Sequence, residues 1–201
     1  NASQVGAFDA NTFMSRKIGN MGFTLLAQKN SHRYYDGDGD GFTDLPQLTK
    51  YNLNPKVFFY FTPKTKLSVG GTFTDEIREG GDIDLLNHQY SDSLNFYKET
   101  NDISRITSQV KLDHKFNDNN SVALRNSFNI FHRGIEITPA YSLGEYRFAG
   151  EQVSSFSEIA FTFRKKENVL ITGTNFYTDD FNEEKLQSTF LTVASILLAQ
   201  V

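Results

Sequence analysis

The feature that most limits how this chain can fold is a long alternation of apolar and polar residues, clearest between Leu48 and Glu79. A period of two residues is typical of a β-strand and not of an amphipathic helix. Ordinary strands are about 5–6 residues long, whereas a tilted strand that crosses a bilayer needs roughly 9–11. The two runs here are of the longer kind and predict membrane-spanning strands. The apolar face of the first run holds Tyr51, Leu53, Pro55, Val57, Phe59 and Phe61.

The same pattern recurs along the chain and predicts four hairpins. The first hairpin is expected to have arms at 5–14 and 21–30, and the fourth carries Ile159, Phe161 and Phe163 and returns through Val169, Ile171 and Gly173. Short turns at one end of a sheet and long loops at the other are typical of outer-membrane barrels. The expected turns centre near Ile18, Lys64, Asp118 and Lys166, and the expected long loops are His32–Gln47, Gly80–Asp102, Gly134–Gly150 and Thr178–Gln187.

Composition supports a sheet that is apolar on one face and polar on the other. Hydrophobic residues make up only 38% of the chain, although 19 Phe and 9 Tyr are present. The net charge of −4 gives no electrostatic case for a nucleic-acid partner. The absence of cysteine excludes a disulfide framework and a cysteine zinc site. The sequence contains no apolar run long enough for a transmembrane helix, since such a helix needs about 20 residues.

The sharpest local motif is the run from Asp36 to Asp44, in which Asp and Gly alternate before Phe42 and Thr43. Carboxylates at every second position can surround one hard cation, and the glycines permit a tight curl. The run matches the start of an EF-hand loop, but Gln47 stands where a bidentate Glu is expected and the flanks are strand-like. We therefore expect either a single calcium loop or a soluble Asp/Gly turn cluster. The candidate calcium ligands are Asp36, Asp38, Asp40 and Asp44.

Other catalytic or binding motifs do not occur, and we expect no enzymatic activity. The chain has no nucleophile elbow, no Gly-rich phosphate loop and no H-E-x-x-H. The histidines are not at ligand spacing, and His114 and His132 are expected at strand ends. The acidic run Asp179, Asp180, Glu183 and Glu184 is interpreted as a solvated loop tip. Charged residues of both signs on the polar faces can line a wet channel: Lys56, Glu76, Arg78, Arg105, Lys111, Asp113, Lys115, Arg125, Glu158 and Arg164.

The Asp/Gly run with the following Leu45-Pro46 and Tyr51-Asn52-Leu53, and the preceding strand Gly22-Phe23-Thr24-Leu25, resembles a barrel segment of TonB-dependent outer-membrane receptors. The similar branch imports ferric siderophores or vitamin B12 in Bacteroidetes-like Gram-negative bacteria. The resemblance implies a large, plugged barrel of about 22 strands. It also implies contact with outer-membrane lipid, an iron-chelate or cobalamin ligand, and coupling to TonB through a plug. No stretch of this chain matches the plug or the TonB-contacting box.

We therefore expect an all-β, up-and-down transmembrane barrel or part of one, with eight or nine long strands. Residues 1–187 form the barrel segment, and residues 188–201 are a candidate ninth strand that matches the family poorly. The main expectation is a fragment of an outer-membrane import receptor. The alternatives are a self-contained eight-stranded barrel with a structural or adhesive role and, more weakly, a soluble calcium-dependent binding module. A kelch-type propeller or a soluble sandwich also alternates, but a propeller blade needs four short strands in about 50 residues.

Overall fold

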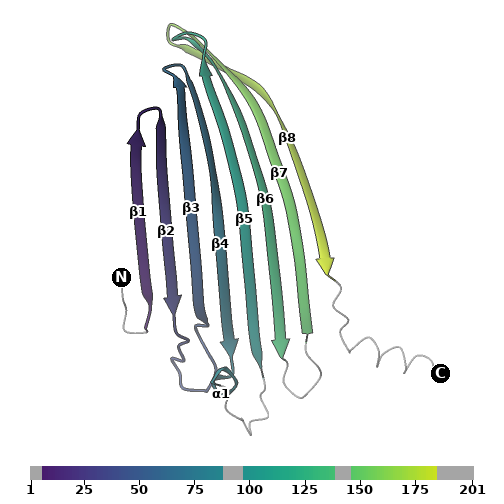
Figure 1. Cartoon of the computed structure of the whole chain (residues 1–201). Coiled ribbons are helices and arrows are strands. Elements are labelled where there is room, and N and C mark those ends of the chain that lie inside the picture. The colour runs from purple at the N-terminus through teal and green to yellow at the C-terminus, as the bar shows by residue number, and fades with distance from the viewer. Residues whose placement is uncertain (1–5, 88–96, 139–145, 185–201) are drawn as a thin grey trace, which may run out of the picture.

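Eight antiparallel strands in chain order form one curved sheet (Figure 1). The computed structural model describes residues 6–87, 97–138 and 146–184. The expected all-β, up-and-down arrangement is confirmed. The strands are β1 (Phe8–Ile18), β2 (Met21–His32), β3 (Gln47–Thr62), β4 (Thr65–Gly81), β5 (Lys98–Lys115), β6 (Asn120–Thr138), β7 (Tyr146–Lys165) and β8 (Asn168–Glu184). One short helix, α1 (Ile83–Leu86), follows β4.

The strands are longer than the sequence pattern predicts. The first hairpin turns at Gly19-Asn20, so β1 continues to Ile18 instead of ending near residue 14. Gly19 has a φ of 55°, a left-handed conformation that glycine adopts without strain. β4 also extends through Gly81, and β5 begins at Lys98, inside the expected second loop. The polar ends of these strands lack apolar alternation, and the sequence pattern therefore did not predict them as strand.

The C-terminal hairpin differs most from the expectation. The residues around Asp179 and Asp180 belong to β8, which pairs with β7 as far as Glu184, so they are not a loop tip. Cross-strand partners share a face of the sheet. Ile171 pairs with Thr162, whereas Leu170 pairs with Phe163. The apolar face of β8 is therefore shifted by one residue from the run Val169, Ile171 and Gly173. The candidate ninth strand at 188–201 lies outside the described residues.

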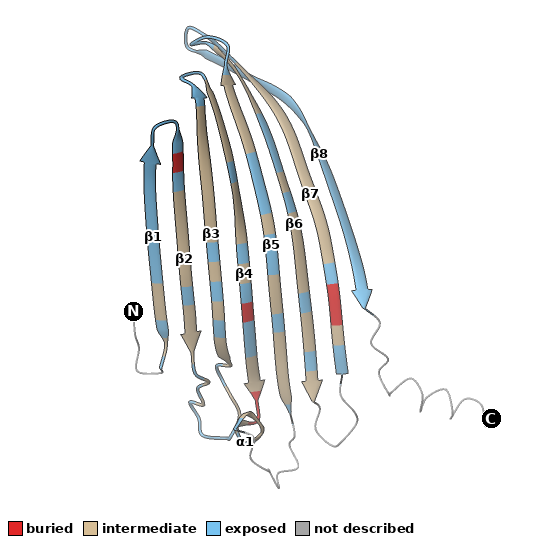
Figure 2. Ribbon diagram, viewed as in Figure 1, coloured by how far each residue is buried: buried red, intermediate tan, exposed pale blue. Residues whose placement is uncertain are grey.

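The sheet is a single layer without a conventional core (Figure 2). Ala149 is the one buried hydrophobic residue in the described part of the chain, and no large side chain there is fully buried. Large apolar side chains instead remain exposed along the strands. No helix among the described residues is long and apolar enough to cross a membrane. The stability of this sheet must therefore come from strand pairing and from whatever covers its faces.

The two outer edges of the sheet are open. β1 pairs only with β2 and β8 only with β7, and the order of strands does not close into a ring within the described residues. β1 and β8 lie at opposite ends of the curved sheet (Figure 1). Both edges carry unpaired backbone donors and acceptors, which are suited to pair with further strands.

Candidate functional site

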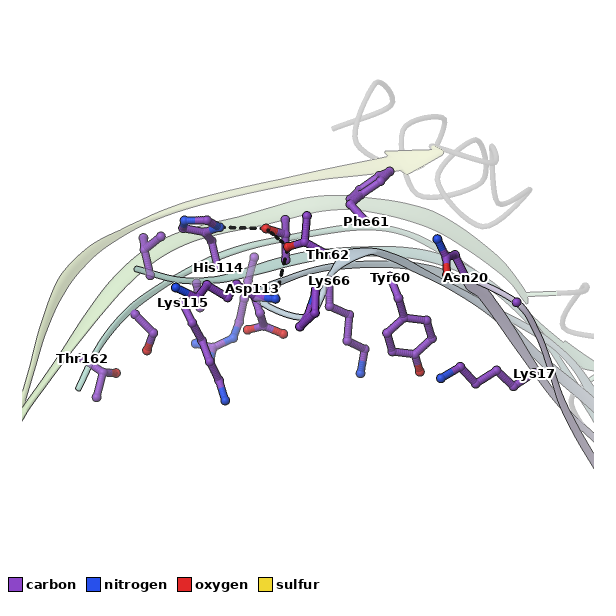
Figure 3. Close-up of a pocket in the computed structure, with 18 residues that line it drawn as sticks. Lys17, Asn20, Tyr60, Phe61, Thr62, Lys66, Asp113, His114, Lys115 and Thr162 are labelled. Atoms are coloured by element: carbon purple, nitrogen blue, oxygen red, sulfur yellow. Dashed lines mark hydrogen bonds between the residues drawn. The ribbon is translucent and has the colours of Figure 1, made fainter. Parts of the chain in front are cut away.

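The two faces of the sheet differ in chemistry, and the register assigns every strand residue to one of them. Tyr60, Lys66 and Lys115 lie on the inner side of the curve, while Phe61 and His114 project from the outer side (Figure 3). We call these sides the concave face and the convex face. Paired residues continue each face across the sheet, and the ten charged residues expected on the polar faces all fall on the concave face.

The convex face carries rows of exposed apolar side chains. One such row runs across neighbouring strands through Leu53, Phe73, Ile106, Ile130 and Val153. The first three of these side chains are 41%, 46% and 51% exposed. The adjacent row toward the turns is mixed, with Gly71, Ser108, Phe128 and Ser155, and the row after it has Val69 and Val110 beside Asn126 and Ser157. Exposed apolar side chains spread over several rows are typical of a surface that contacts lipid or another protein.

The next row toward the long loops is polar. It runs from Lys29 through Tyr51 and then through Asp75, Ser104, His132 and Glu151. His132 therefore lies within β6 and not at a strand end as expected. This row marks a boundary on the convex face, because the rows on its turn side contain large apolar side chains whereas this row contains charged ones. Beyond it the strands continue toward the loops with mostly polar side chains.

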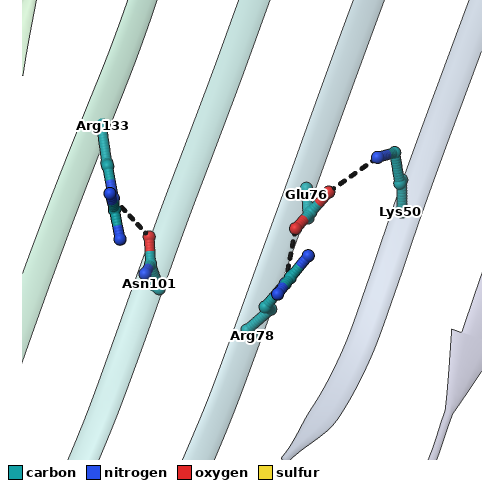
Figure 4. Close-up of polar contacts among 5 residues, drawn as sticks. All are labelled: Lys50, Glu76, Arg78, Asn101 and Arg133. Atoms are coloured by element: carbon teal, nitrogen blue, oxygen red, sulfur yellow. Dashed lines mark hydrogen bonds and ion pairs between the residues drawn. The ribbon is translucent and has the colours of Figure 1, made fainter.

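The concave face holds a buried carboxylate near the loop end of the sheet (Figure 4). Glu76 is only 4% exposed. Its carboxylate accepts from Lys50 Nζ at 2.9 Å and from Arg78 Nε at 2.5 Å. Two cations around one carboxylate leave a net positive charge at this point of the wall. Such a network fixes the side chains in place because each polar group has a partner.

Two further arginines extend this region across β5 and β6. Arg133 Nε donates to Asn101 Oδ1 at 3.1 Å (Figure 4). The Arg105 guanidinium lies 4.6 Å from the centre of the Phe131 ring. Both side chains are anchored by uncharged groups, so their positive charge remains available to an anion. The sequence predicted a polar face for Arg105 but made no such prediction for Arg133, and it did not indicate which residues would be in contact.

The Asp/Gly run forms a compact loop that brings three of its four predicted ligands together. One carboxylate oxygen from each of Asp36, Asp38 and Asp40 lies within 4.8 Å of the others. The fourth, Asp44, is turned to the backbone instead and accepts from the Gly37 N–H at 2.7 Å. The three clustered carboxylates are of the chemical type that binds calcium, and the flanking elements are strands, as expected.

Backbone amides already hold the first of these carboxylates. The N–H groups of Gly39 and Gly41 donate to Asp36 at 2.7 Å and 3.1 Å. The hydrogen bond from Gly39 is the largest influence on the pKa of Asp36 and helps to lower it below its usual value. The carboxylate is therefore ionised at neutral pH and ready to receive a cation.

The Asp loop is tied to the segment after β4, a connection that the sequence did not predict. Thr43 N donates to the Gly81 carbonyl at 3.0 Å, and Gly81 N donates to Thr43 Oγ1 at 2.8 Å. Ile83 N donates to the Gly41 carbonyl at 3.0 Å.

The helix α1 has a sequence signal that was not used. The Asp82 side chain caps α1 by accepting from Asp84 N. Asp followed by a short apolar run is a helix-start signal that could have located α1.

Comparisons with known proteins identify the fold but not the family. No protein-family profile matches the sequence, and no curated protein matches it either. The structure is similar to the closed form of the ferric-catecholate import receptor Fiu from E. coli K12, with a TM-score of 0.65 and 11% sequence identity. The match covers 92% of this chain and 31% of that receptor chain. The chain thus spans about a third of the receptor's length and shares its barrel-like fold.

Proposed function

We propose that this chain forms part of the wall of an outer-membrane barrel of the TonB-dependent import-receptor type. The observation that carries the proposal is the convex face, where exposed apolar rows end at a polar row. In such a barrel the convex face contacts lipid, the short turns lie on the periplasmic side and the long loops lie outside the cell.

The height of the apolar surface supports this placement. Ten residue steps separate Ile106, in the last apolar row, from Phe116, which follows β5 at the turn end. At about 3.4 Å per residue and a tilt of about 40°, this distance projects to roughly 26 Å. Outer-membrane barrels carry an apolar band about 25 Å tall. The strands of 16 to 20 residues from β3 to β7 then extend beyond the membrane on the loop side.

The proposed cargo is an iron-siderophore or cobalamin-type ligand, with energy relayed by TonB through a plug contributed by polypeptide outside this segment. Support comes from the sequence resemblance and from the arginines near the loop end of the concave face, Arg78, Arg105 and Arg133, which can attract an anionic chelate. Binding of ferric tris-catecholate and of cyanocobalamin to the chain in uncharged micelles, measured by calorimetry, tests the ligand class. We expect Arg105→Gln with Arg133→Gln to weaken ferric-catecholate binding, and no binding of either compound would reject the proposed cargo.

Membrane contact can be tested separately because the chain has no native cysteine to interfere with labelling. Single cysteines would be placed at Leu124, on the convex face, and at the neighbouring concave position Arg125. A fluorescent label at residue 124 should be quenched by lipids that carry a quencher in the acyl chain, while the label at residue 125 should respond to a water-soluble quencher. Equal quenching of the two labels by lipid would contradict the assignment of faces.

The self-contained eight-stranded barrel is disfavoured by the open edges of the sheet, because such a barrel must pair β1 with β8. Cysteine cross-linking tests this alternative directly. A cysteine pair at Gln28 and Asn52, which are partners in β2 and β3, should cross-link, whereas a pair at Asn11 and Asn175 in β1 and β8 should not. The soluble calcium module is disfavoured by the exposed apolar rows of the convex face.

We also propose that the Asp loop binds one calcium ion through Asp36, Asp38 and Asp40. Support comes from the convergence of their oxygens within 4.8 Å. Carboxylates that close on a cation would stiffen a loop that is joined to β4 through Thr43 and Gly81. A rigid external loop would hold the ligand-facing end of the wall in one arrangement.

A further inference from the structure

A hollow of about 430 Å³ lies between two neighbouring short turns of the sheet. The turn after β5 contributes Asn117 and Asn119, and the turn after β7 contributes Lys165 and Asn168. The two turns are joined, because Arg164 N donates to the Asn119 carbonyl at 2.9 Å. Both turns lie at the end of the sheet opposite to the Asp loop (Figure 1). We call this space the turn hollow.

Part of the lining of the turn hollow is apolar and belongs to the convex face. Phe163 and Leu170 line it, and they are exposed cross-strand partners in β7 and β8. The Phe161 ring stacks on the Phe163 ring with ring centres 6.5 Å apart. Phe161 in turn pairs with Val122 on β6. The apolar lining is therefore continuous with the apolar surface that is assigned to lipid.

The turn hollow also contains two uncompensated cations. Arg164 and Lys165 line it, and neither has a carboxylate within ion-pair distance among the described residues. Asp118 and Glu167 belong to the same two turns but do not line the hollow. The guanidinium group presents a fork of N–H donors that matches the geometry of a phosphate, and the ammonium group adds a point charge. An anion that enters the hollow therefore meets positive charge.

Asparagines supply uncharged donors beside these cations. The Asn117 side-chain oxygen accepts from the N–H groups of Asn119 and Asn120, both at 2.9 Å. These bonds hold the turn in shape and leave the amide N–H groups of Asn117 without a partner in the described part of the chain. Asn120 lines the hollow too and shares the convex face with Phe163, its cross-strand partner. Polar and apolar groups thus meet along one rim.

This combination selects an amphiphile with an anionic head over a soluble polyanion. A soluble polyanion would leave Phe163 and Leu170 exposed to water, whereas a glycerophospholipid can cover them with the first carbons of its acyl chains. A zwitterionic headgroup carries an ammonium group that two unpaired cations repel, so a headgroup with net negative charge is favoured. The location agrees, because the short turns of an outer-membrane barrel lie at the periplasmic boundary of the bilayer.

We propose that the turn hollow binds the headgroup of an anionic glycerophospholipid from the leaflet at the turn end. The inference rests on the proposed barrel placement and adds a headgroup-selective site to general contact with lipid. The phosphate would accept hydrogen bonds from Arg164, Lys165 and the Asn117 amide. The acyl chains would then follow the convex face past Phe161.

The test uses the full chain in phosphatidylcholine bilayers, with a fluorophore on one introduced cysteine. Thr174→Cys places the label on the convex face of β8 near Leu170, and Leu53→Cys places it on the same face of β3, far from the hollow. Phosphatidylglycerol or phosphatidylcholine with brominated acyl chains is added as a minor component and quenches the label by contact. At residue 174 the brominated phosphatidylglycerol should quench at least about threefold more strongly, because basic side chains at a membrane surface attract anionic lipid. At residue 53 the two lipids should quench equally.

Variants of the two cations test whether this preference belongs to the hollow. Arg164→Gln with Lys165→Gln should remove it, whereas Arg164→Lys with Lys165→Arg retains the charge and should retain it. The matched control, Arg16→Gln with Lys17→Gln, removes two cations beside another short turn and should leave the preference unchanged. If the glutamine pair fails to fold, Lys165→Gln alone should still reduce the preference about twofold.

The possible results separate this site from the barrel placement on which it rests. Equal quenching by the two brominated lipids at residue 174 would overturn the site and leave the placement intact. Equal loss of the preference in the site and control variants would also overturn it, because the attraction would then be general. Suppression of the preference by an equal amount of soluble glycerol phosphate would show that the acyl chains are irrelevant and would overturn the lipid assignment. Quenching by neither lipid at either residue would instead reject the barrel placement, and the inference with it.

Discussion

Lys50 Nζ lies 2.9 Å from the carboxylate of Glu76, which is only 4% exposed although it is on an open face of a single-layer sheet. The long side chains of Lys50 and Arg78 cover the carboxylate from both sides, since each carries an apolar stem below its charged end. This carboxylate therefore holds β3 and β4 together by contacts beyond the backbone ladder.

Replacement of Glu76 by Ala should lower the free energy of unfolding by about 2 kcal/mol, because two cations then lose the buried group that they share. Urea unfolding in detergent, followed by circular dichroism, measures the change. The matched variant Asp113→Ala breaks the Lys111–Asp113 pair, whose side chains are 43% and 39% exposed, and should cost about 0.5 kcal/mol or less. An equal cost for the two variants would show that burial of Glu76 is irrelevant.

The boundary on the convex face predicts a dependence on depth within one strand. Val110 and Ser104 both lie on the convex face of β5, but Val110 is in the apolar region and Ser104 is in the polar row. Val110→Arg should destabilise the sheet in lipid by about 2–4 kcal/mol, and Ser104→Arg by about 0–1 kcal/mol. Unfolding by urea in lipid vesicles measures both values. Similar costs would place the membrane boundary elsewhere.

The sequence predicted the fold because the strand signal is repeated and local. The faces of β2 to β6 follow from alternation alone, and Phe59 and Leu67 pair on the same face as expected. The pattern failed at strand ends such as Lys98–Asp102, where both faces are polar and alternation disappears. In β8 the alternation assigned Ile171 to the apolar face, whereas Leu170 lies there. The assignment was wrong because these two residues are adjacent and both apolar.

The contacts of the candidate site were less predictable. The spacing of Asp36, Asp38 and Asp40 predicted their convergence, but nothing in the sequence distinguished Asp44, which turns to Gly37. The link between Thr43 and Gly81 joins segments that are distant in sequence. Such contacts depend on how the loops at one end of the sheet lie next to each other, which no local pattern specifies.

The arrangement of the Asp loop predicts unequal effects of its carboxylates on calcium binding. Asp38→Asn should weaken calcium binding at least tenfold, since it removes one of the three clustered charges. Asp44→Asn should have a smaller effect, because that carboxylate is directed to the Gly37 N–H. Isothermal titration calorimetry with calcium chloride compares the two. Binding lost equally in both variants would make Asp44 a fourth ligand.

The same loop should be sensitive to acid when calcium is absent. Hydrogen bonds from Gly39 and Gly41 lower the pKa of Asp36 below its usual value of 3.8. A carboxyl group with a lowered pKa stabilises the folded loop above pH of about 3.8, and this contribution is lost as pH falls through the lowered pKa. Amide exchange at Gly39 and Gly41, measured by NMR, should accelerate in that acidic range. The variant Asp36→Asn should show fast exchange at neutral pH, and unchanged exchange would contradict the assignment.

Gly81 joins the Asp loop to the sheet and should not tolerate a side chain. Its φ of 123° is strained for any other residue, and an added methyl group would collide with the Tyr97 carbonyl oxygen. Gly81→Ala should therefore destabilise the protein by about 1–3 kcal/mol. Gly134→Ala is the control, because the nearest atom to its added methyl group is the Asp102 Cβ at 4.0 Å. Since Gly81 also binds Thr43, its replacement should weaken calcium binding by the loop, whereas Gly134→Ala should leave it unchanged. Loss of stability with full retention of calcium affinity would show that the loop keeps its shape without its attachment to β4.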